Sequence, residues 1–356
     1  MCYAVMADET ADISGKEQLS IGLRFFDQNQ EVIREEFVGF QVIEKQDAET
    51  IANTIDSSII SFNLMPENCI GFGFDGCSTM AGKENGVQAI LRRKYKKAFF
   101  FHCSSHRLNL VVNDLNKVSE IRNTIATVKD TINFFRESPS RKQFAPNISK
   151  MCETRWSEKH KAIERFEKHF IEIVKSLDLL STTGNNATRK SAYQLHSAIK
   201  KSSFIVSFIV IAKYSAFLTP VVNILQKKSI DMVNVCEHMD RIEELFTSDR
   251  NEAERITAEI LEKAEYFAEE LDIELTLPRV TERQTLRANP PASNASEYWR
   301  RTIVIPYLDS VISSMKTRFS PEHRPLFELS SIHPACMIKK REDGVLTYHG
   351  KHCQIL

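Results

Sequence analysis

The sequence predicts a mixed α/β domain followed by a large all-helical region. The first observation is a series of short apolar runs, each five to nine residues long and bounded by turn or charged residues, that ends near residue 103. The second is an apolar spacing of three to four residues from Ser104 to about residue 330. The third is size: 356 residues, 42% of them apolar, suffice for two domains or for one domain with a large insertion.

Five of the apolar runs in the first region are expected to be strands. Asp47 can cap a helix between the third and fourth of them, because Ile51, Ile55 and Ile59 recur after it at helical spacing. A shorter helix fits residues 86–97. The order is therefore strand, strand, strand, helix, strand, helix, strand. The expected strands are Tyr3–Ala7, Leu19–Phe26, Val32–Phe40, Cys69–Phe74 and Ala98–Cys103.

Two apolar stripes mark the helical region, one from Ile163 to Leu177 and one from Ile256 to Leu271. Breaks are expected near residues 181–191, near 248–254 and at 286–296. The apolar segment Ser203–Leu225 carries Lys213 at its centre, and its uninterrupted apolar run falls short of the roughly 20 residues that a membrane span needs, so a buried helix is expected. We divide the chain into a core half at 1–118, a helical insertion at 119–290 and a returning segment with a divergent tail at 291–356.

Charge and cysteine content exclude little but favour a reduced, intracellular protein. Lys plus Arg equals Asp plus Glu at 47 each, so a contact with nucleic acid must come from a local patch. The eight Cys are scattered without a CxxC pair, and no secretory leader pattern opens the chain. A disulfide framework is therefore not expected, and neither is a membrane or small-molecule partner.

An acidic residue directly follows two of the expected strands. Asp8 follows the first strand, with Glu9 and Asp12 close behind, and Asp75 follows the fourth strand and precedes Gly76. Either group can be a polar turn, since Asp before Gly is a common turn pairing. If the two strands are neighbours, both carboxylates lie within reach of one divalent cation, and oxygen ligands suit Mg²⁺ or Mn²⁺. We expect Asp8 and Asp75 at the same edge of one sheet, on adjacent strands, with converging side chains.

Four sequence blocks resemble the transposase core of the hAT superfamily, especially its domesticated copies with MYM-type or THAP-type zinc fingers. They are "DETADISGKEQLS", "FDGCSTMAGKENGV", "HCSSHRLNLVVND" and "CETRWSE", in the family's order, and the resemblance covers about residues 3–335. It implies a ribonuclease H-like sheet with a helical insertion, Asp8 and Asp75 as the first two catalytic acids, and Mg²⁺ or Mn²⁺ as a weakly held or absent cofactor. It also implies a nuclear location, DNA as a partner, and homo-oligomers in full-length relatives.

Other residues match the family by position. Cys103 and His106 match its Cys-x-x-His pair, which could contribute to a metal site or instead be a packed thiol and a hydrogen-bonded imidazole that brace the fifth strand. Arg155 and Trp156 match an Arg-Trp pair near the DNA end; Trp156 could stack on an unpaired base or anchor two helices. The one dense basic run includes Arg92, Arg93, Lys96 and Lys97 around Tyr95, and it is either a phosphate contact or a solvated helix end.

The carboxyl-terminal tail departs from the family. The family has a third catalytic Glu in a short motif of small residues followed by Glu-Arg and an aromatic residue, and no such motif occurs before the chain ends. Glu342 is an available acid, but Arg341 and Asp343 do not reproduce the pattern. The zinc-finger module that precedes the core in the family is also missing, so we expect a core truncated at both ends.

Three functions remain open at the level of sequence. The first is a transposon-derived protein that has lost catalysis and retains binding to DNA, protein or both. The second is an active metal-dependent transposase or nuclease that uses Asp8, Asp75 and an unrecognised third acid. The third is a helical interaction scaffold with no role in nucleic-acid binding. Metal-dependent cleavage distinguishes the second, and salt-dependent DNA binding distinguishes the first from the third.

Overall fold

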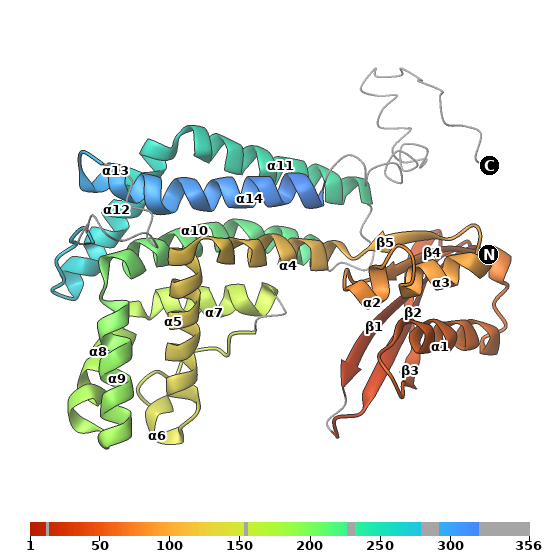
Figure 1. Cartoon of the computed structure of the whole chain (residues 1–356), viewed down its shortest axis with the longest axis horizontal. Helices are drawn as coiled ribbons and strands as arrows, with labels where there is room; N and C mark the ends of the chain where they lie inside the picture. The colour runs from red at the N-terminus through yellow and green to blue at the C-terminus, as the bar shows by residue number, and fades with distance from the viewer. Residues whose placement is uncertain (12–13, 153–155, 226–231, 279–291, 320–356) are drawn as a thin grey trace.

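The computed structural model describes residues 1–11, 14–152, 156–225, 232–278 and 292–319, with a sheet at one end of the molecule and long helices at the other (Figure 1). The expected fold class is confirmed: a five-stranded mixed sheet is followed, within these ranges, by helices without a further strand. Each part has its own hydrophobic core. Residues between 3 and 98 build the first core, and residues between 108 and 315 build the second.

The sheet has the strand order β3-β2-β1-β4-β5. β2 pairs antiparallel with both β1 and β3, whereas β4 pairs parallel with both β1 and β5. A parallel pair needs a crossover connection, and a helix supplies it here on each side of β4. The strands are β1 (Tyr3–Ala11), β2 (Glu17–Asp27), β3 (Val32–Val42), β4 (Cys69–Phe74) and β5 (Phe99–His102).

β1 is longer than the sequence predicted. The expected strand ended at Ala7, but β1 continues to Ala11, which lies opposite Glu17 of β2. Antiparallel pairing with β2 therefore holds residues 8–11, of which the first three are polar, in extended conformation, where sequence pattern alone suggested a turn. Asp8 lies inside the strand, opposite Ser20, so the premise that Asp8 follows the strand was wrong.

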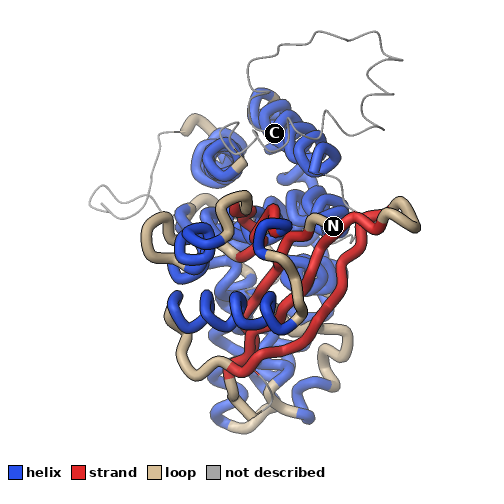
Figure 2. The backbone as a smooth tube through the Cα atoms, turned by 90° about the vertical axis from the view of Figure 1, so that its right-hand side faces the viewer, coloured by secondary structure: helices blue, strands red, loops and turns tan. Residues whose placement is uncertain are grey.

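Three helices cover one face of the sheet, and Figure 2 shows helical turns in front of the strands from the sheet end of the molecule. Asp47 caps the first helix as predicted, since its Oδ1 accepts a hydrogen bond from the Thr50 amide at 2.9 Å. Ile51 and Ile55 of this helix are fully buried in the first core. The helices are α1 (Ala48–Ser61), α2 (Ser78–Ala81) and α3 (Val87–Lys94), with a 3-10 turn at Pro66–Asn68.

Exposed aromatic side chains occupy the other face along the edge strand. Phe37 and Phe40 of β3 are 62% and 54% exposed, and their rings are 5.0 Å apart. Phe26 of β2 is 48% exposed. β3 has no buried residue, so the sheet is held to its helices mainly through β1, β2 and β4.

The second part consists of helices arranged around α10, which packs against α5, α7, α11 and α12. Phe170, Phe204, Phe208 and Phe267 form a cluster of rings in its core, with centroids 5.0–6.2 Å apart. The helices are α4 (Ser104–Asp114), α5 (Ser119–Arg136), α6 (Pro139–Lys142), α7 (Trp156–Lys168), α8 (Phe170–Thr183), α9 (Asn186–Ile199), α10 (Ser202–Leu225), α11 (Met232–Asn251), α12 (Ala253–Glu270), α13 (Ala295–Trp299) and α14 (Ile305–Arg318), with a 3-10 turn at Leu115–Lys117 and a π-helical segment at Arg300–Val304.

The apolar helix α10 was expected to be buried, and this is confirmed. One helical stretch among the described residues, Ser202–Pro220, has the length and apolarity of a membrane span, but 72% of its most apolar window is buried inside the protein. Ile205, Phe208 and Tyr214 are each fully buried. Burial of this extent is what the core helix of a globular protein shows, so the stretch is weak support for a span.

The first predicted stripe of the helical region belongs to two helices. Ile163 and Phe166 lie on α7, whereas Phe170 and Leu177 lie on α8, and the backbone breaks at His169 between them. All four apolar residues are buried, so the prediction of a core face holds although the prediction of one helix does not. The core of the helical part begins before residue 118, since it includes Leu108 of α4. The proposed boundaries at 118 and 290 stay predictions.

A polar clasp holds the returning helix α14 against α4. The carboxylate of Asp114 accepts hydrogen bonds from Ser314 Oγ at 2.6 Å and from Arg318 Nε and Nη2 at 3.0 and 2.8 Å. Arg107, near the start of α4, donates to the Arg318 carbonyl at 3.4 Å. The end of α14 therefore lies beside the helix that leaves the sheet after β5.

Candidate functional site

The parallel pairing of β1 with β4 places the two candidate acids at the same edge of the sheet. Met6 lies opposite Gly73, and both strands run in the same direction. Asp8 comes two residues after Met6, and Asp75 comes two residues after Gly73. The two acids are thus on adjacent strands at one edge, as the acid-pair hypothesis requires. Whether they bind a metal stays a prediction.

The turn after β4 uses the Asp75 carboxylate. Asp75 Oδ1 accepts a hydrogen bond from the Cys77 amide at 3.1 Å, which is the geometry of an Asx turn. Gly76 is required at this turn because a Cβ atom there would lie 2.1–2.2 Å from the His102 ring. One of the four lone pairs of Asp75 is therefore committed to holding its own turn.

The shifted pKa of Glu9 shows that Asp75 lies near it. The pKa of Glu9 is raised first by burial and then by the negative charges of Asp75, Glu17 and Asp8. Neighbouring residues of a strand point to opposite faces, so Glu9 and Asp8 leave β1 on different sides. The negative charge of Asp75 thus raises the pKa of Glu9. The expected convergence of the Asp8 and Asp75 side chains stays a prediction.

Glu9 and His102 are the residues whose importance the sequence reasoning missed. The sequence pattern placed Glu9 among acids that could form a polar turn, but it is a half-buried strand residue opposite Leu19. The signal was its place on the same alternating face as the buried Val5 and Ala7. Asp12 lies outside the described residues.

His102 and His106 meet where β5 passes into α4, with ring centroids 5.3 Å apart. Burial, together with the nearby positive charge of Arg107 and the His106 ring, lowers the pKa of His102 to about 4, so this imidazole is neutral at pH 7. Its Nε2 atom is buried and has no hydrogen-bond partner among the described residues. His102 therefore acts as an uncharged packing group against the Gly76 turn.

Cys103 and His106 do not form the packed pair that was one of the two expectations. The Cys103 side chain is exposed, although its backbone amide donates to the Phe74 carbonyl at 2.8 Å and so ties α4 to the end of β4. His106 lies beside His102 and is half-buried. The bracing role of this segment comes from the backbone of Cys103 and not from its thiol.

The donors at the sheet edge do not complete a metal site. Across the described ranges, no group of three or more His, Cys, Asp or Glu side chains is arranged to hold a metal ion. Asp8 and Asp75 offer hard oxygen ligands of the kind that Mg²⁺ and Mn²⁺ take, but one Asp75 oxygen already accepts from its own turn. The described residues thus do not fit a preorganised metal centre, and we derive no chemical step through one.

The predicted basic run at 92–97 is partly engaged in structure. Tyr95, at its centre, is 1% exposed and donates to Asp56 Oδ1 at 2.6 Å, so it cannot stack on a base. Lys94 pairs with the same carboxylate at 2.6 Å, and Arg92 donates to the Ala98 carbonyl at 3.1 Å. The two contacts with Asp56 fasten the end of α3 to α1, and the Arg92 contact ties α3 to the residue before β5.

The remaining cations of this run are oriented to solvent. Arg93 donates to the Glu84 carbonyl at 3.0 Å, and Lys96 and Lys97 are exposed. A phosphate contact through Lys96 and Lys97 therefore stays a prediction. Arg155 lies outside the described residues, as does the side chain of Trp156, whose backbone begins α7. Glu342 also lies outside the described residues.

The sheet half of the chain matches a known protein family. Residues 1–86 match the family described as ZMYM1/FAM200, RNase-like domain. This range holds β1 to β4 and both candidate acids. The match therefore supports the RNase-like character of the sheet.

Similarity to curated proteins extends over nearly the whole chain. The chain is 25% identical to the 52 kDa repressor of the inhibitor of the protein kinase of Homo sapiens, over 94% of its own length and 46% of that protein. It is 26% identical to the protein of the same name in Mus musculus, over 94% of its own length and 47% of that protein. The chain thus spans about half the length of these relatives. Both comparisons support the transposon-derived family that the sequence blocks resemble, at the level of an RNase-like domain and its helical extension.

Proposed function

We propose that this chain is a hAT-type, transposase-derived protein that binds nucleic acid or protein in the nucleus and does not cut DNA. The observation that carries the proposal is the parallel pairing of β1 and β4, which brings Asp8 and Asp75 to one sheet edge in an RNase-like domain. Such a placement is the ancestral arrangement that the resemblance implies. The proposed loss of cleavage follows from what surrounds these acids.

Metal-assisted strand cleavage depends on ligands held in advance in a fixed geometry, because a metal ion must orient the attacking water and neutralise the leaving oxygen. The Asp75 carboxylate accepts a hydrogen bond from the Cys77 amide. Burial and the negative charge of Asp75 raise the pKa of Glu9, so Glu9 is protonated more readily than it would be in water. His102, beside them, is neutral at pH 7. This environment favours a retained scaffold over a working catalytic centre.

A binding role agrees with the likeness to relatives whose name describes a repressor. Repression by the relatives is their own property, and for this chain it supports a regulatory and nuclear role only as a proposal. The helical part has its own core, so it can keep its fold as a platform for binding. Homo-oligomer formation is part of the same proposal.

The test is a salt titration of DNA binding with the whole chain and a labelled duplex of mixed sequence. Binding through phosphates makes the logarithm of the association constant fall linearly with the logarithm of the salt concentration, by about 0.9 per phosphate contacted. We expect a linear fall with a slope of several units. A chain that binds no duplex even at low salt would be the helical scaffold without a nucleic-acid role.

A further inference from the structure

Five cations gather near the end of α5, and none of them has a carboxylate partner among the described residues. Some cations elsewhere are neutralised by acids, such as Arg24 by Glu35, Lys213 by Glu259 and Arg250 by Asp309. The five make no ion pair within the described ranges, and we call them the α6 cationic surface. They are Arg136, Arg141, Lys142, Lys150 and Arg165.

Contacts with one loop bring these cations together from three helices. Arg136 Nη1, at the end of α5, donates to the Ile148 carbonyl at 3.4 Å. Arg165 of α7 donates to Ser149 Oγ, one residue along. Lys150 follows directly and is exposed. The loop after α6 thus lies between the ends of α5 and α7, whose positions Figure 1 shows.

The remaining two cations lie on α6 itself. The Arg141 guanidinium is 4.3 Å from the centroid of the Phe134 ring of α5, a cation–π contact that fixes its position without neutralising its charge. Lys142 is exposed beside it. Two arginines are therefore held by neutral hydrogen-bond acceptors and a third by a ring, so that the surface presents fixed positive charge at little further cost in side-chain entropy.

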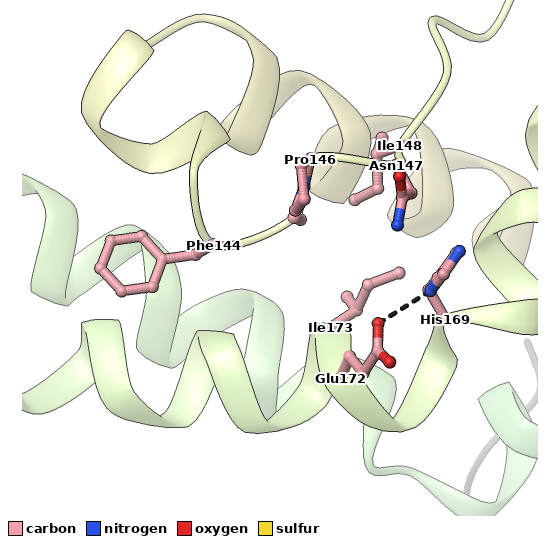
Figure 3. Close-up of a pocket in the computed structure, with 8 residues that line it drawn as sticks. Phe144, Pro146, Asn147, Ile148, His169, Glu172 and Ile173 are labelled. Carbon is pink, nitrogen blue, oxygen red and sulfur yellow. Dashed lines mark hydrogen bonds and ion pairs between the residues drawn. The ribbon is translucent and has the colours of Figure 1, made fainter.

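Lysines neutralise two of the acids near this surface, Glu158 and Glu167. Glu172 lines the pocket under the loop together with Ile173, and its Oε2 lies 2.8 Å from His169 Nδ1, a contact that Figure 3 draws as a dashed line. Glu167 pairs with Lys263 at 2.6 Å. The other acids on α7 and at the end of α5 are Glu158, which pairs with Lys161 at 3.4 Å, Glu164, which lies 3.8 Å from His160, and the exposed Glu137.

We infer that the α6 cationic surface is a binding site for the phosphate backbone of duplex DNA. Five cations without an ion pair outnumber the three nearby acids that no Lys or Arg neutralises, Glu137, Glu164 and Glu172, and give this corner a positive field in a chain whose formal net charge is +0. Fixed guanidinium groups match phosphate oxygens in a bidentate manner, and exposed lysines add charge without sequence preference. The inference rests on the proposed function and names the surface through which the chain holds DNA. No single stretch of sequence shows it, because the five residues span positions 136–165.

The experiment compares four forms of the whole chain by fluorescence anisotropy with a labelled duplex of mixed sequence. The test variant is Lys142→Glu with Lys150→Glu, since neither lysine donates a hydrogen bond to another described residue. The control variant is Lys45→Glu with Lys201→Glu, which makes the same change in net charge at exposed lysines elsewhere. The third variant is Lys96→Glu with Lys97→Glu in the basic run. Circular dichroism checks that each variant is folded.

The expected loss can be derived from counterion release. At a salt concentration of about 0.15 M, a slope of about 0.9 per contact makes each phosphate contact worth roughly fivefold in affinity, so two contacts are worth about 30-fold. We expect the test variant to bind about 30-fold more weakly with a salt slope smaller by about two units, and the control variant to bind within about threefold of the unchanged chain. Excess polyglutamate serves as a competitor that carries negative charge without phosphates, and it should not displace the duplex.

Three results would overturn the inference while leaving the proposed function intact. The first is unchanged affinity in the test variant with a loss confined to Lys96→Glu with Lys97→Glu. The second is an equal loss in the test and control variants, which would reflect net charge alone. The third is ready displacement by polyglutamate, which would indicate a surface for acidic protein partners. If the unchanged chain binds no duplex, the proposed DNA role and this inference both fail.

Discussion

Replacing Asp114 by Ala should break the clasp between α4 and α14. Asp114 accepts from Ser314 and twice from Arg318 at 2.6–3.0 Å, and Lys117 Nζ lies 3.1 Å from its other oxygen. The Asp114 side chain is 19% exposed and that of Arg318 is 28% exposed. The contacts are therefore partly shielded from water but not desolvated. The substitution leaves the Arg318 guanidinium and the Ser314 hydroxyl without their acceptor.

The magnitude follows from the number and exposure of these bonds. A hydrogen bond to a charged group contributes about 1.5–3 kcal/mol when shielded, whereas an exposed ion pair contributes about 0.2–1 kcal/mol. Because the Asp114 clasp lies between these limits, we expect Asp114→Ala to lower the free energy of unfolding by about 2 kcal/mol. For a domain of roughly 150–250 residues this corresponds to a fall in Tm of about 4–8 °C.

The same clasp has a defined pH dependence. Burial alone would raise the pKa of Asp114, but the hydrogen bonds from Ser314, Arg318 and Lys117 outweigh it and hold the pKa below the ordinary value of 3.8. A depressed pKa contributes stability that is present above the unfolded pKa and is lost as the pH falls through the folded pKa. The difference between the unchanged chain and Asp114→Ala should therefore be full at pH 7 and shrink below about pH 4.

The assay is urea denaturation followed by circular dichroism, with Asp309→Ala as the control. Asp309 is on the same helix and pairs with Arg250, but its side chain is 53% exposed. Its removal should change the free energy of unfolding by less than about 1 kcal/mol. Equal losses for the two variants, or a loss for Asp114→Ala that does not change with pH, would refute the account of the clasp.

Three further outcomes are expected. Phe170→Ala should lower the free energy of unfolding by about 3–5 kcal/mol in urea denaturation, because Phe170 is fully buried in the ring cluster of the helical core; a loss below about 1 kcal/mol would contradict that packing. Burial lowers the pKa of His160, whose Nδ1 lies 2.7 Å from Ser215 Oγ, so this residue contributes to a fall in stability as the pH drops below about 6.5, and His160→Gln should make that fall smaller in urea denaturation; an equal fall in both forms would contradict this. Asp75→Asn should shift the pKa of Glu9 downward in a carboxyl NMR titration, since the Asp75 charge helps to raise it; an unchanged pKa would show that the two groups are not coupled.

The local features of the fold could be predicted from the sequence because short-range signals decide them. Asp47 caps α1 through the amide three residues on, and the break between α8 and α9 falls where Asn185 caps the next helix. Alternation and helical spacing likewise gave the order of strands and helices in the sheet half. These features depend on neighbours within one or two turns.

The features that were missed depend on contacts distant in sequence. The extension of β1 to Ala11 needs its partner strand β2, and the neutral state of His102 needs burial at the junction with α4. The α6 cationic surface needs a loop that meets the ends of two helices. Asp75 could be named from the end of its strand, although Asp8 proved to lie inside β1, and the Asp75 carboxylate is held by the turn at Gly76.

Cleavage of DNA by the purified chain tests the central claim most directly. Labelled hairpin and duplex substrates would be incubated with Mn²⁺, the intact chain and an Asp75→Ala control, and the products separated on a denaturing gel. If Asp8 and Asp75 remain as a structural inheritance without a complete catalytic centre, the intact chain should leave both substrates uncut to the same extent as the control. Strong Mn²⁺-dependent cleavage that disappears in Asp75→Ala would contradict the claim and show a working active site at the edge of β1 and β4.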